Sequence, residues 1–422
     1  MHSLKGEIKV PGDKSISHRA VMIGSLAKGT TLVNGFLNGA DCLSTIDCMR
    51  KLGVEIDYSL DTPDRVEVKG KGLFGLKAPA DTLYTGNSGT TTRIISGLLS
   101  AQPFEVRIDG DSSIRKRPMK RIMDPLSLMG AKISSELENG CAPLIIKPSS
   151  LHGINYDSPV SSAQVKSAII MAALYASGET VINEPSKSRD HTELMLSSFG
   201  ADIRSEGNTV TVFPGNELTA QEITIPGDIS SAAFFLAAGA ITKGSEVLIK
   251  NVNINPTRAG IIKVLFDMGA SLTIQNERLL SGEKTADLLI KSSELHGTEI
   301  SGDIIPTLID EFPVIAVMAS YASGQTVIRD AAELRVKESD RILSITENLK
   351  TMGADVSATS DGMVINGGKK LNASHVSTKK DHRIAMAFHV ASLPLDDEND
   401  LDDRDCVNIS YPGFFSDMES LY

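Results

Sequence analysis

The chain has 422 residues, 41% hydrophobic and 23% charged, a composition typical of a soluble protein with more than one domain. Its formal net charge of −11 argues against a nucleic-acid partner, because nucleic-acid phosphates would be repelled on average. No apolar run reaches the ~20 residues of a membrane span, no signal peptide is recognisable, and the four cysteines show no metal or disulfide spacing. We therefore expect a cytoplasmic protein with no membrane or nucleic-acid partner.

The first predicted helix follows a Pro-Gly turn in VPGDKSISHRAVM (10–22), with Asp13 or Ser15 as its N-cap. Lys14, His18 and Arg19 stand in its first two turns, an unusual density of positive charge for an anionic chain. Taken alone, such a cluster is most simply a solvated helix start.

A second copy of this turn provides a control. VPGDKS (10–15) recurs as IPGDIS (225–230), an offset of 215 residues, and at that offset Lys14, His18 and Arg19 become Ile229, Ala233 and Phe234. The turn and cap are common to both copies, whereas the charges are not. The fold therefore does not require the charges, which favours a functional role for them.

A longer pattern organises the whole chain. An apolar residue, a glycine and a β-like stretch recur as LGVEI (52–56), MGAKI (129–133), FGADI (199–203), MGASL (268–272) and MGADV (352–356). An amphipathic helix is predicted before each glycine, which closes it in the left-handed region, and strands such as GQTVIRD (324–330) precede most of these helices. The period indicates one supersecondary unit copied five times.

The segments DHRIAMAFHVAS and VNISYPGFF form a shortened sixth copy, whose missing opening strand SLKGEIKVPG (3–12) could supply. The expected domains are therefore 1–13 plus 228–422 (domain I) and 14–227 (domain II), with crossovers near 11–13 and 226–228.

Each repeat helix opens near a charged residue: Asp41, Arg117, Arg189, Arg258 and Arg341. Cations are unfavourable at a helix N-terminus unless an anion lies between them and the helix dipole. Four arginines at equivalent positions therefore predict an anion-binding surface at one end of the units.

Two further stretches carry polar chemistry. In RVKESDR (335–341), Lys337 and Arg341 are expected on one helical face with Glu338 near Arg341. Taken alone, the stretch is more simply a salt-bridged helix start capped by Ser339 or Asp340. GNSGTTTR (86–93) resembles an anion nest without P-loop spacing.

Acid–base candidates are scarcer. Asp310, next to Glu311, precedes a strongly apolar helix, where a plain N-cap is the alternative. GKGLFG (70–75) matches a dinucleotide fingerprint, but no apolar helix follows it, so that interpretation is rejected.

Six motifs together resemble the EPSP synthase family, the 3-phosphoshikimate 1-carboxyvinyltransferases. They are PGDKSISHRA, GNSGTTTR, RKRPM, SAQVKSA, RVKESDR and DHRIAM, in the family's order and spanning residues 8 to about 416. The resemblance implies a mixed α/β (α+β) fold of two similar domains. Each would hold three βαβαββ repeats (an inside-out α/β barrel), with the active site in the interdomain cleft.

The resemblance also implies the reaction: the enolpyruvyl group of phosphoenolpyruvate passes to the 5-hydroxyl of shikimate 3-phosphate and phosphate is released. The catalytic residues would be Asp310 as base, with Glu338 and Lys14 sharing the role of acid. Shikimate 3-phosphate would contact Lys14, Ser15, Arg19, Ser162, Ala163, Gln164, Arg189, Asp310 and Lys337. Phosphoenolpyruvate would contact Lys14, Asn87, Gly89, Thr90, Arg117, Gln164, Arg341 and Arg383. Domain I, the phosphoenolpyruvate side of the site, would contribute Lys337, Arg341 and Arg383. No metal or organic cofactor is required.

The sequence departs from the family's pattern in two places, and the first is SAQ (162–164), where other members have SSQ. Some members carry a lysine just before the final xxPxxF, where NISYPGFF (408–415) has Ile409 and Ser410. The contact of that lysine with phosphoenolpyruvate is therefore missing or replaced. Gly89 is the residue type of members inhibited by glyphosate, which we expect to bind here. We also expect a monomer.

Two alternatives remain open at this stage. The related UDP-N-acetylglucosamine enolpyruvyl transferases use a cysteine in the loop near the RP motif, but here the nearest cysteine is Cys141, outside that loop. A non-catalytic anion-binding protein would lack acid–base groups, whereas Asp310 and Glu338 are both present.

Overall fold

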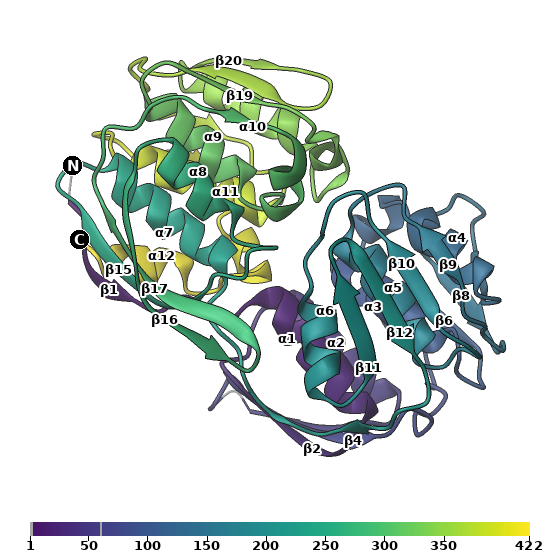
Figure 1. Ribbon diagram of the computed structural model, residues 1–422. Coiled ribbons are helices and arrows are strands. Elements are labelled where there is room, and N and C mark those ends of the chain that lie inside the picture. Colours follow the sequence, from purple (N-terminus) through teal and green to yellow (C-terminus); the bar gives the residue numbers. More distant parts are fainter. Residues whose placement is uncertain (1–2, 60) are drawn as a thin grey trace. The chain divides into compact units, whose positions relative to one another are not determined.

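The computed structural model describes residues 3–59 and 61–422 as two compact units (Figure 1). Unit 1 comprises the chain up to Pro11, Pro226–Leu279 and Lys284–Tyr422, and unit 2 comprises Gly12–Ile225 and Leu280–Glu283. The short segment Leu280–Glu283 has no counterpart in the repeat pattern. In unit 2, Oε1 of Glu283 lies 2.6 Å from Nδ1 of the buried His191.

The helices of unit 2 are α1 (Lys14–Leu26), α2 (Ala40–Lys51), α3 (Gly89–Leu99), α4 (Lys120–Leu128), α5 (Ala163–Ala173) and α6 (His191–Ser198), with a 3₁₀ turn at Ile114–Lys116. One sheet contains β2 (Ala27–Asn34), β3 (Glu55–Tyr58), β4 (Arg65–Lys71), β13 (Leu218–Thr219) and β14 (Glu222–Thr224). The second contains β5 (Leu83–Tyr84), β6 (Val106–Asp109), β7 (Lys132–Ser135) and β8 (Leu144–Lys147). The third contains β9 (Asn155–Asp157), β10 (Thr180–Asn183), β11 (Asp202–Glu206) and β12 (Thr209–Phe213).

The helices α1, α3 and α5 form the interior of unit 2. Nearly all their residues are buried, and α3 packs against both α1 and α5. A helix that is buried on every face must lie inside its domain, with the sheets and the amphipathic helices around it. Consequently the N-terminal ends of these three helices, rather than their sides, remain accessible to a ligand.

Unit 1 repeats this plan. Its helices are α7 (Ile229–Ile241), α8 (Gly260–Asp267), α9 (Phe312–Tyr321), α10 (Arg341–Thr351), α11 (His382–Ser392) and α12 (Phe414–Glu419), with 3₁₀ turns at Gly302–Thr307, Ala332–Val336 and Asp405–Ile409. Its strands are β1 (Lys5–Ile8), β15 (Glu246–Asn253), β16 (Ser271–Leu280), β17 (Glu283–Lys291), β18 (Glu299–Ile300), β19 (Gln325–Ile328), β20 (Asp355–Ala358), β21 (Met363–Asn366), β22 (His375–Val376) and β23 (Asp400–Leu401). The strands form sheets in the orders β1-β15-β17-β16, β18-β19-β21-β20 and β22-β23.

In unit 1, α7, α9 and α11 pack on one another and are buried along almost their whole length (Figure 1). The alanine-rich sequence of α7, ISSAAFFLAAGAI, suits this position because small residues allow close helix packing while Phe234 and Phe235 fill the remaining space. The apolar α7 thus occupies the place that the charged α1 occupies in unit 2.

The local predictions from the repeat pattern are confirmed. Each of the glycines 53, 130, 200, 269 and 353 follows a helix and has a positive φ, between 79° and 97°. Asp13 and Asp228 cap α1 and α7, accepting hydrogen bonds from the backbone N–H groups of Ile16 and Ser230 at 2.9 Å. The predicted mixed α/β class, several small sheets with helices, is confirmed as well.

The expected place of the N-terminal strand is wrong. Residues 5–8 form β1, but β1 pairs in parallel with β15 in the first sheet of unit 1 rather than opening the shortened sixth repeat. The sixth repeat keeps only the two-stranded sheet β22-β23. The equivalent of β1 in unit 2 is β14, which pairs in parallel with β2, so each first sheet is completed by the strand that precedes a crossover.

Within residues 3–59 and 61–422, no helix is both long and apolar enough to cross a membrane.

Candidate functional site

The cations of unit 2 gather where its interior helices begin. Lys14 is the first residue of α1, and its ammonium group forms an ion pair with Asp41 in the first turn of α2. Asp41 was the one acidic residue among the five charged residues at the repeat-helix starts. Its carboxylate balances the charge of Lys14.

Arg19 lies one turn further along α1 and is buried. Its guanidinium donates to the hydroxyl of Thr192 at 2.6 Å, to that of Ser167 at 2.7 Å and to the carbonyl of Ser15 at 2.9 Å. Burial lowers the pKa of Arg19 to about 10, and the charge of Arg189 acts in the same direction. A buried guanidinium held by neutral hydroxyls keeps its positive charge available to an anion.

His18 has a structural role. Its Nδ1 lies 2.7 Å from Oγ1 of Thr45, which lies 2.7 Å from Oγ1 of Thr91, so one hydrogen-bonded chain links α1, α2 and α3. Burial and the charges of Lys14 and Arg19 hold the pKa of His18 well below its usual range, and the imidazole is neutral.

The GNSGTTTR motif contains the start of α3, with Ser88 as its N-cap and Gly89 as its first residue. Arg117 donates to the side-chain oxygen of Asn87 at 3.2 Å. A Cβ on Gly89 would lie 3.0 Å from Nη1 of Arg117 and 3.2 Å from Nη1 of Arg93. The absence of a side chain at Gly89 therefore leaves room for two guanidinium groups.

The start of α5 joins this group. Gln164 donates to the hydroxyl of Thr90 at 3.0 Å, and its carbonyl oxygen accepts from Arg93 at 2.5 Å. Ser162 and Ala163, the N-cap and first residue of α5, directly precede Gln164. Sequence reasoning gave Arg93 no role, although it stands in a quoted motif.

Lys166 is a residue that sequence reasoning missed. Its ammonium group is only 1% exposed and lies 2.8 Å from carboxylate oxygens of both Glu184 and Glu193. It also donates to the carbonyl of Ser188 at 3.2 Å. These contacts fix the segment that carries Arg189 to α5. The only signal for Lys166 in the sequence was its place in SAQVKSA, because its partners Glu184 and Glu193 lie in a later part of the chain.

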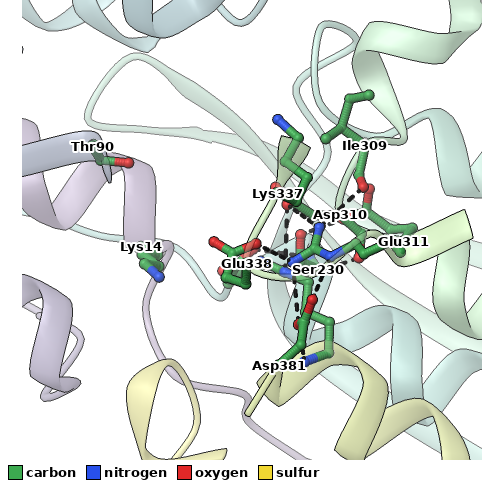
Figure 2. Close-up of polar contacts among 12 residues, drawn as sticks. Lys14, Thr90, Ser230, Ile309, Asp310, Glu311, Lys337, Glu338 and Asp381 are labelled. Carbon is green, nitrogen blue, oxygen red and sulfur yellow. Dashed lines mark hydrogen bonds and ion pairs between the residues drawn. The ribbon is translucent and has the colours of Figure 1, made fainter. Parts of the chain in front are cut away.

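In unit 1, Arg341 is the first residue of α10 and is 1% exposed. Its guanidinium donates to Glu338 at 2.7 Å and to Asp381 at 2.9 Å, and lies 3.4 Å from the carboxylate of Asp310. Figure 2 shows Asp310, Glu338 and Asp381 turned toward a common centre. Asp381 also caps α11 by accepting from the backbone N–H of Arg383 at 3.0 Å, so it links the two arginines.

The second arginine, Arg383, lies 3.4 Å from Oδ1 of Asp310 through its Nε. Behind Asp310, the buried Arg258 donates to Glu311 at 2.9 Å and to Asp228 at 3.2 Å, and its Nη2 lies 3.9 Å from Asp310. Asp310 therefore faces three guanidinium groups. Sequence reasoning named Arg258 only as a helix-start arginine and missed the role of Asp381.

The prediction that Lys337 and Arg341 share a helical face is wrong. Asp340 is the N-cap of α10, accepting from the backbone N–H of Leu343 at 3.1 Å, so Lys337 lies outside the helix in extended backbone. Lys337 forms an ion pair with Glu333 at 3.0 Å. Burial lowers the pKa of Lys337 despite the opposing charges of Glu333, Asp310 and Glu338.

The predicted residues thus fall into two groups, one in each unit. Unit 1 holds Asp310, Lys337, Glu338, Arg341 and Arg383. Unit 2 holds Lys14, Ser15, Arg19, Asn87, Gly89, Thr90, Arg117, Ser162, Ala163, Gln164 and Arg189. Ile409 and Ser410 lie in unit 1, at and just after the end of a 3₁₀ turn. In the described ranges, no group of three or more His, Cys, Asp or Glu side chains is arranged to hold a metal ion.

Comparison with known proteins decides the family. A family model described as EPSP synthase (3-phosphoshikimate 1-carboxyvinyltransferase) matches residues 1–418. The chain belongs to the EPSP synthase family. It is 53% identical over 411 residues to the 3-phosphoshikimate 1-carboxyvinyltransferase of Brevibacillus brevis, covering 97% of this chain and 96% of that one. It is 50% identical over 422 residues to that of Bacillus subtilis strain 168, covering 100% and 98%.

The fold comparison agrees. The EPSP synthase structure from Acinetobacter baumannii is similar with a TM-score of 0.88 and 46% sequence identity, covering 99% of this chain and 96% of that one. The predicted family membership is therefore confirmed over the whole length of the chain.

Proposed function

We propose that the two groups of side chains, one in each unit, act on the same pair of substrates in the reaction of the EPSP synthase family. The chain is a transferase of the shikimate pathway and moves the enolpyruvyl group of phosphoenolpyruvate to shikimate 3-phosphate. One observation supports the assignment of Asp310 as base and of Arg341 and Arg383 as anion-binding groups: the Asp310 carboxylate lies 3.4 Å from both arginines.

The residues of unit 2 suit shikimate 3-phosphate. The N-termini of α1 and α5 offer backbone N–H groups and the positive end of the helix dipole to a phosphate or carboxylate. Lys14, Ser15, Arg19 and Arg189 add charge and hydroxyl donors beside α1, and Ser162, Ala163 and Gln164 do so at α5. Lys337 and Asp310 of unit 1 complete this proposed set.

Phosphoenolpyruvate carries a phosphate and a carboxylate, so it needs several cations. We assign it Lys14, Asn87, Gly89, Thr90, Arg117 and Gln164 from unit 2, with Arg341 and Arg383 from unit 1. Charge-assisted hydrogen bonds contribute roughly 1.5–3 kcal/mol each. Part of that energy is lost again, because Arg341 and Arg383 must exchange carboxylate contacts for ligand contacts.

The chemistry requires one base and one acid. The 5-hydroxyl oxygen of shikimate 3-phosphate adds to C2 of phosphoenolpyruvate while Asp310 takes the hydroxyl proton, and C3 receives a proton from Glu338 or Lys14. The tetrahedral adduct then loses phosphate from C2 and a proton from C3, which leaves the enolpyruvyl ether. Arg341 and Arg383 stabilise the negative charge of the departing phosphate.

The Asp310→Asn variant tests this assignment. Phosphate release from phosphoenolpyruvate and shikimate 3-phosphate is measured at saturating substrates, where loss of a general base lowers kcat about 10²–10⁴-fold. The control is Asp355→Asn, which removes an exposed carboxylate paired with Lys369 in the same unit and should leave kcat unchanged. An Asp310→Asn enzyme with parental kcat would refute the base assignment.

The same assay separates the alternatives. Phosphate release with shikimate 3-phosphate supports the proposal, and release with UDP-N-acetylglucosamine instead would favour the related transferase reaction. No release with either acceptor would favour a binding protein.

We also propose that the chain acts as a monomer in the cytoplasm and that glyphosate competes with phosphoenolpyruvate. All side chains assigned to the two substrates come from a single chain, and Gly89 leaves the two guanidinium groups beside it unobstructed.

A further inference from the structure

Unit 2 contains a cavity of about 720 Å³ that none of the substrate-binding residues lines. It lies between the end of β4 with the Gly72–Gly75 loop that follows it, the C-terminal end of α5 and the connection from β12 to β13. The GKGLFG motif, which failed as a dinucleotide fingerprint, supplies one wall through residues 71–75. We call this cavity the Phe74 pocket.

The walls of the Phe74 pocket are largely apolar. Leu73, Phe74, Leu174, Tyr175 and Leu218 contribute side chains to it. Phe74 is 76% exposed, an unusual state for a phenylalanine, and its ring meets Tyr175 edge-on with centroids 5.6 Å apart. An exposed aromatic ring beside a cavity is a favourable contact surface for an apolar ligand, because binding removes that ring from water.

The charged lining residues of the pocket are Lys28, Lys71 and Glu217. Lys28 is paired with Glu217, with side chains 63% and 68% exposed, and Lys71 lies 3.2 Å from Glu55. Ion pairs this exposed to solvent contribute little to stability. The ammonium groups can therefore exchange their present carboxylates for that of a ligand at small cost.

The pocket is distant from the substrate residues along α5. Ala163 opens this helix among the substrate-binding residues, whereas Leu174, its C-cap, lines the pocket. Eleven residues at 1.5 Å each separate the two ends by about 16 Å. The volume of the pocket falls in the range of roughly 300–1,000 Å³ typical of small-molecule sites.

We propose that the Phe74 pocket is a second ligand site, for a small molecule with an aromatic or branched apolar body and one carboxylate. The apolar body lies against Phe74 and Tyr175, and the carboxylate pairs with Lys71 or Lys28. This site goes beyond the transferase reaction and does not depend on it.

The sequence contains no tryptophan, so Phe74→Trp introduces a single fluorescent reporter at the pocket. The probe is 3-phenylpropionate, titrated in the presence of saturating shikimate 3-phosphate so that the substrate cations are occupied. We expect a saturable change in tryptophan emission, with a Kd for 3-phenylpropionate at or below about 1 mM. The neutral 3-phenylpropanamide and the cationic 2-phenylethylamine should bind at least about tenfold more weakly.

Matched variants locate the binding. Adding Lys71→Gln to the reporter protein should weaken 3-phenylpropionate about fivefold or more, and Phe74→Ala should abolish the heat of binding that calorimetry detects in the parent. Transferase activity of these variants should stay within about twofold of the parent, which shows that they fold. Two results would each overturn the proposal: no saturation by about 10 mM, or equal binding of acid, amide and amine.

Discussion

Replacing Lys166 with methionine gives the sharpest test of how unit 2 holds its cations in place. Methionine fills a similar volume but removes the one ammonium group that lies 2.8 Å from both Glu184 and Glu193. All three side chains are at most 4% exposed, so the two carboxylates are left buried without their cation. Removing one partner of a buried ion pair costs about 3–5 kcal/mol.

Hydrogen exchange followed by mass spectrometry is the appropriate assay, because the effect is local and the protein has two units. A loss of about 3–5 kcal/mol accelerates exchange of α5 and of residues 184–198 by about two to four orders of magnitude. The control is Lys263→Met, which removes an exposed pair with Asp267 within α8. It should change exchange of α8 by less than about threefold.

The pH dependence provides a second readout. Its two carboxylate neighbours raise the pKa of Lys166. The stabilisation from its charge is therefore complete below about pH 10 and is lost only above it, so the parent shows no change from this source between about pH 6 and 9. Burial raises the pKa of Glu193, and removing the ammonium group raises it further. The folded variant then holds a proton that the unfolded chain releases, so the variant becomes less stable as the pH rises through that range.

A triple variant tests whether the loss of protection comes from the unpaired buried carboxylates. Lys166→Met combined with Glu184→Gln and Glu193→Gln removes the buried charges altogether and should recover most of the lost protection. If Lys166→Met alone exchanges as slowly as the parent at both about pH 6 and about pH 9, the buried triad does not hold the 184–193 segment and the reasoning fails.

Three further predictions concern other parts of the molecule. Gly89→Ala places a Cβ 3.0 Å from Arg117, so the KM for phosphoenolpyruvate should rise about tenfold. Micromolar glyphosate should no longer inhibit this variant at limiting phosphoenolpyruvate. Gly413→Ala, whose added Cβ meets only contacts of 3.4 Å or longer, is the control in the same steady-state assays. Asp381→Asn keeps the shape of the α11 cap but weakens the ion pair with Arg341. The kcat/KM for phosphoenolpyruvate should therefore fall about 10–100-fold, while the KM for shikimate 3-phosphate changes less than about threefold. Equal effects on both substrates would argue against a local role of Asp381. Burial lowers the pKa of His389 to about 4, so the unfolded chain gains a proton between about pH 6.5 and 4 that the folded chain does not. Unfolding experiments should therefore show the parent losing about 3 kcal/mol relative to His389→Leu between pH 7 and pH 4.

Local sequence signals predicted much of the fold because their causes are local. A glycine after an amphipathic stretch ends a helix wherever that stretch lies, and Asp13 and Asp228 cap helices through hydrogen bonds that span two or three residues. The comparison of Lys14 with Ile229 was informative for the same reason. Two copies of one turn share their backbone requirements, so a difference between them reports something other than the backbone.

The counter-ions could not be predicted in this way. Arg341 contacts Asp381, 40 residues later, and Arg258 contacts Glu311, 53 residues later, so these pairs depend on how the repeats pack. The error at Lys337 has a different cause. Asp340 was recognised as a possible cap, but an N-cap residue has non-helical backbone, so the helical period cannot extend back to Lys337. That Leu280–Glu283 belongs to unit 2 was not predicted from the sequence, because this turn between two strands is not part of the repeat pattern.

The distances around Arg341 separate the three carboxylates by function. Asp381 is fully buried and lies 2.9 Å from the guanidinium, so its charge is fixed in a structural pair. Glu338 is held at 2.7 Å, whereas Asp310 lies at 3.4 Å from both Arg341 and Arg383, beyond the usual range of a strong charge-assisted hydrogen bond. The Asp310 side chain is 19% exposed, and we propose that it accepts the hydroxyl proton when a phosphate takes over the arginines. The same phosphate would compete directly with Glu338 for Arg341, because Glu338 lies 2.7 Å from that guanidinium. This difference in pairing supports the proposal that Asp310 is the base, while the acid role stays shared between Glu338 and Lys14.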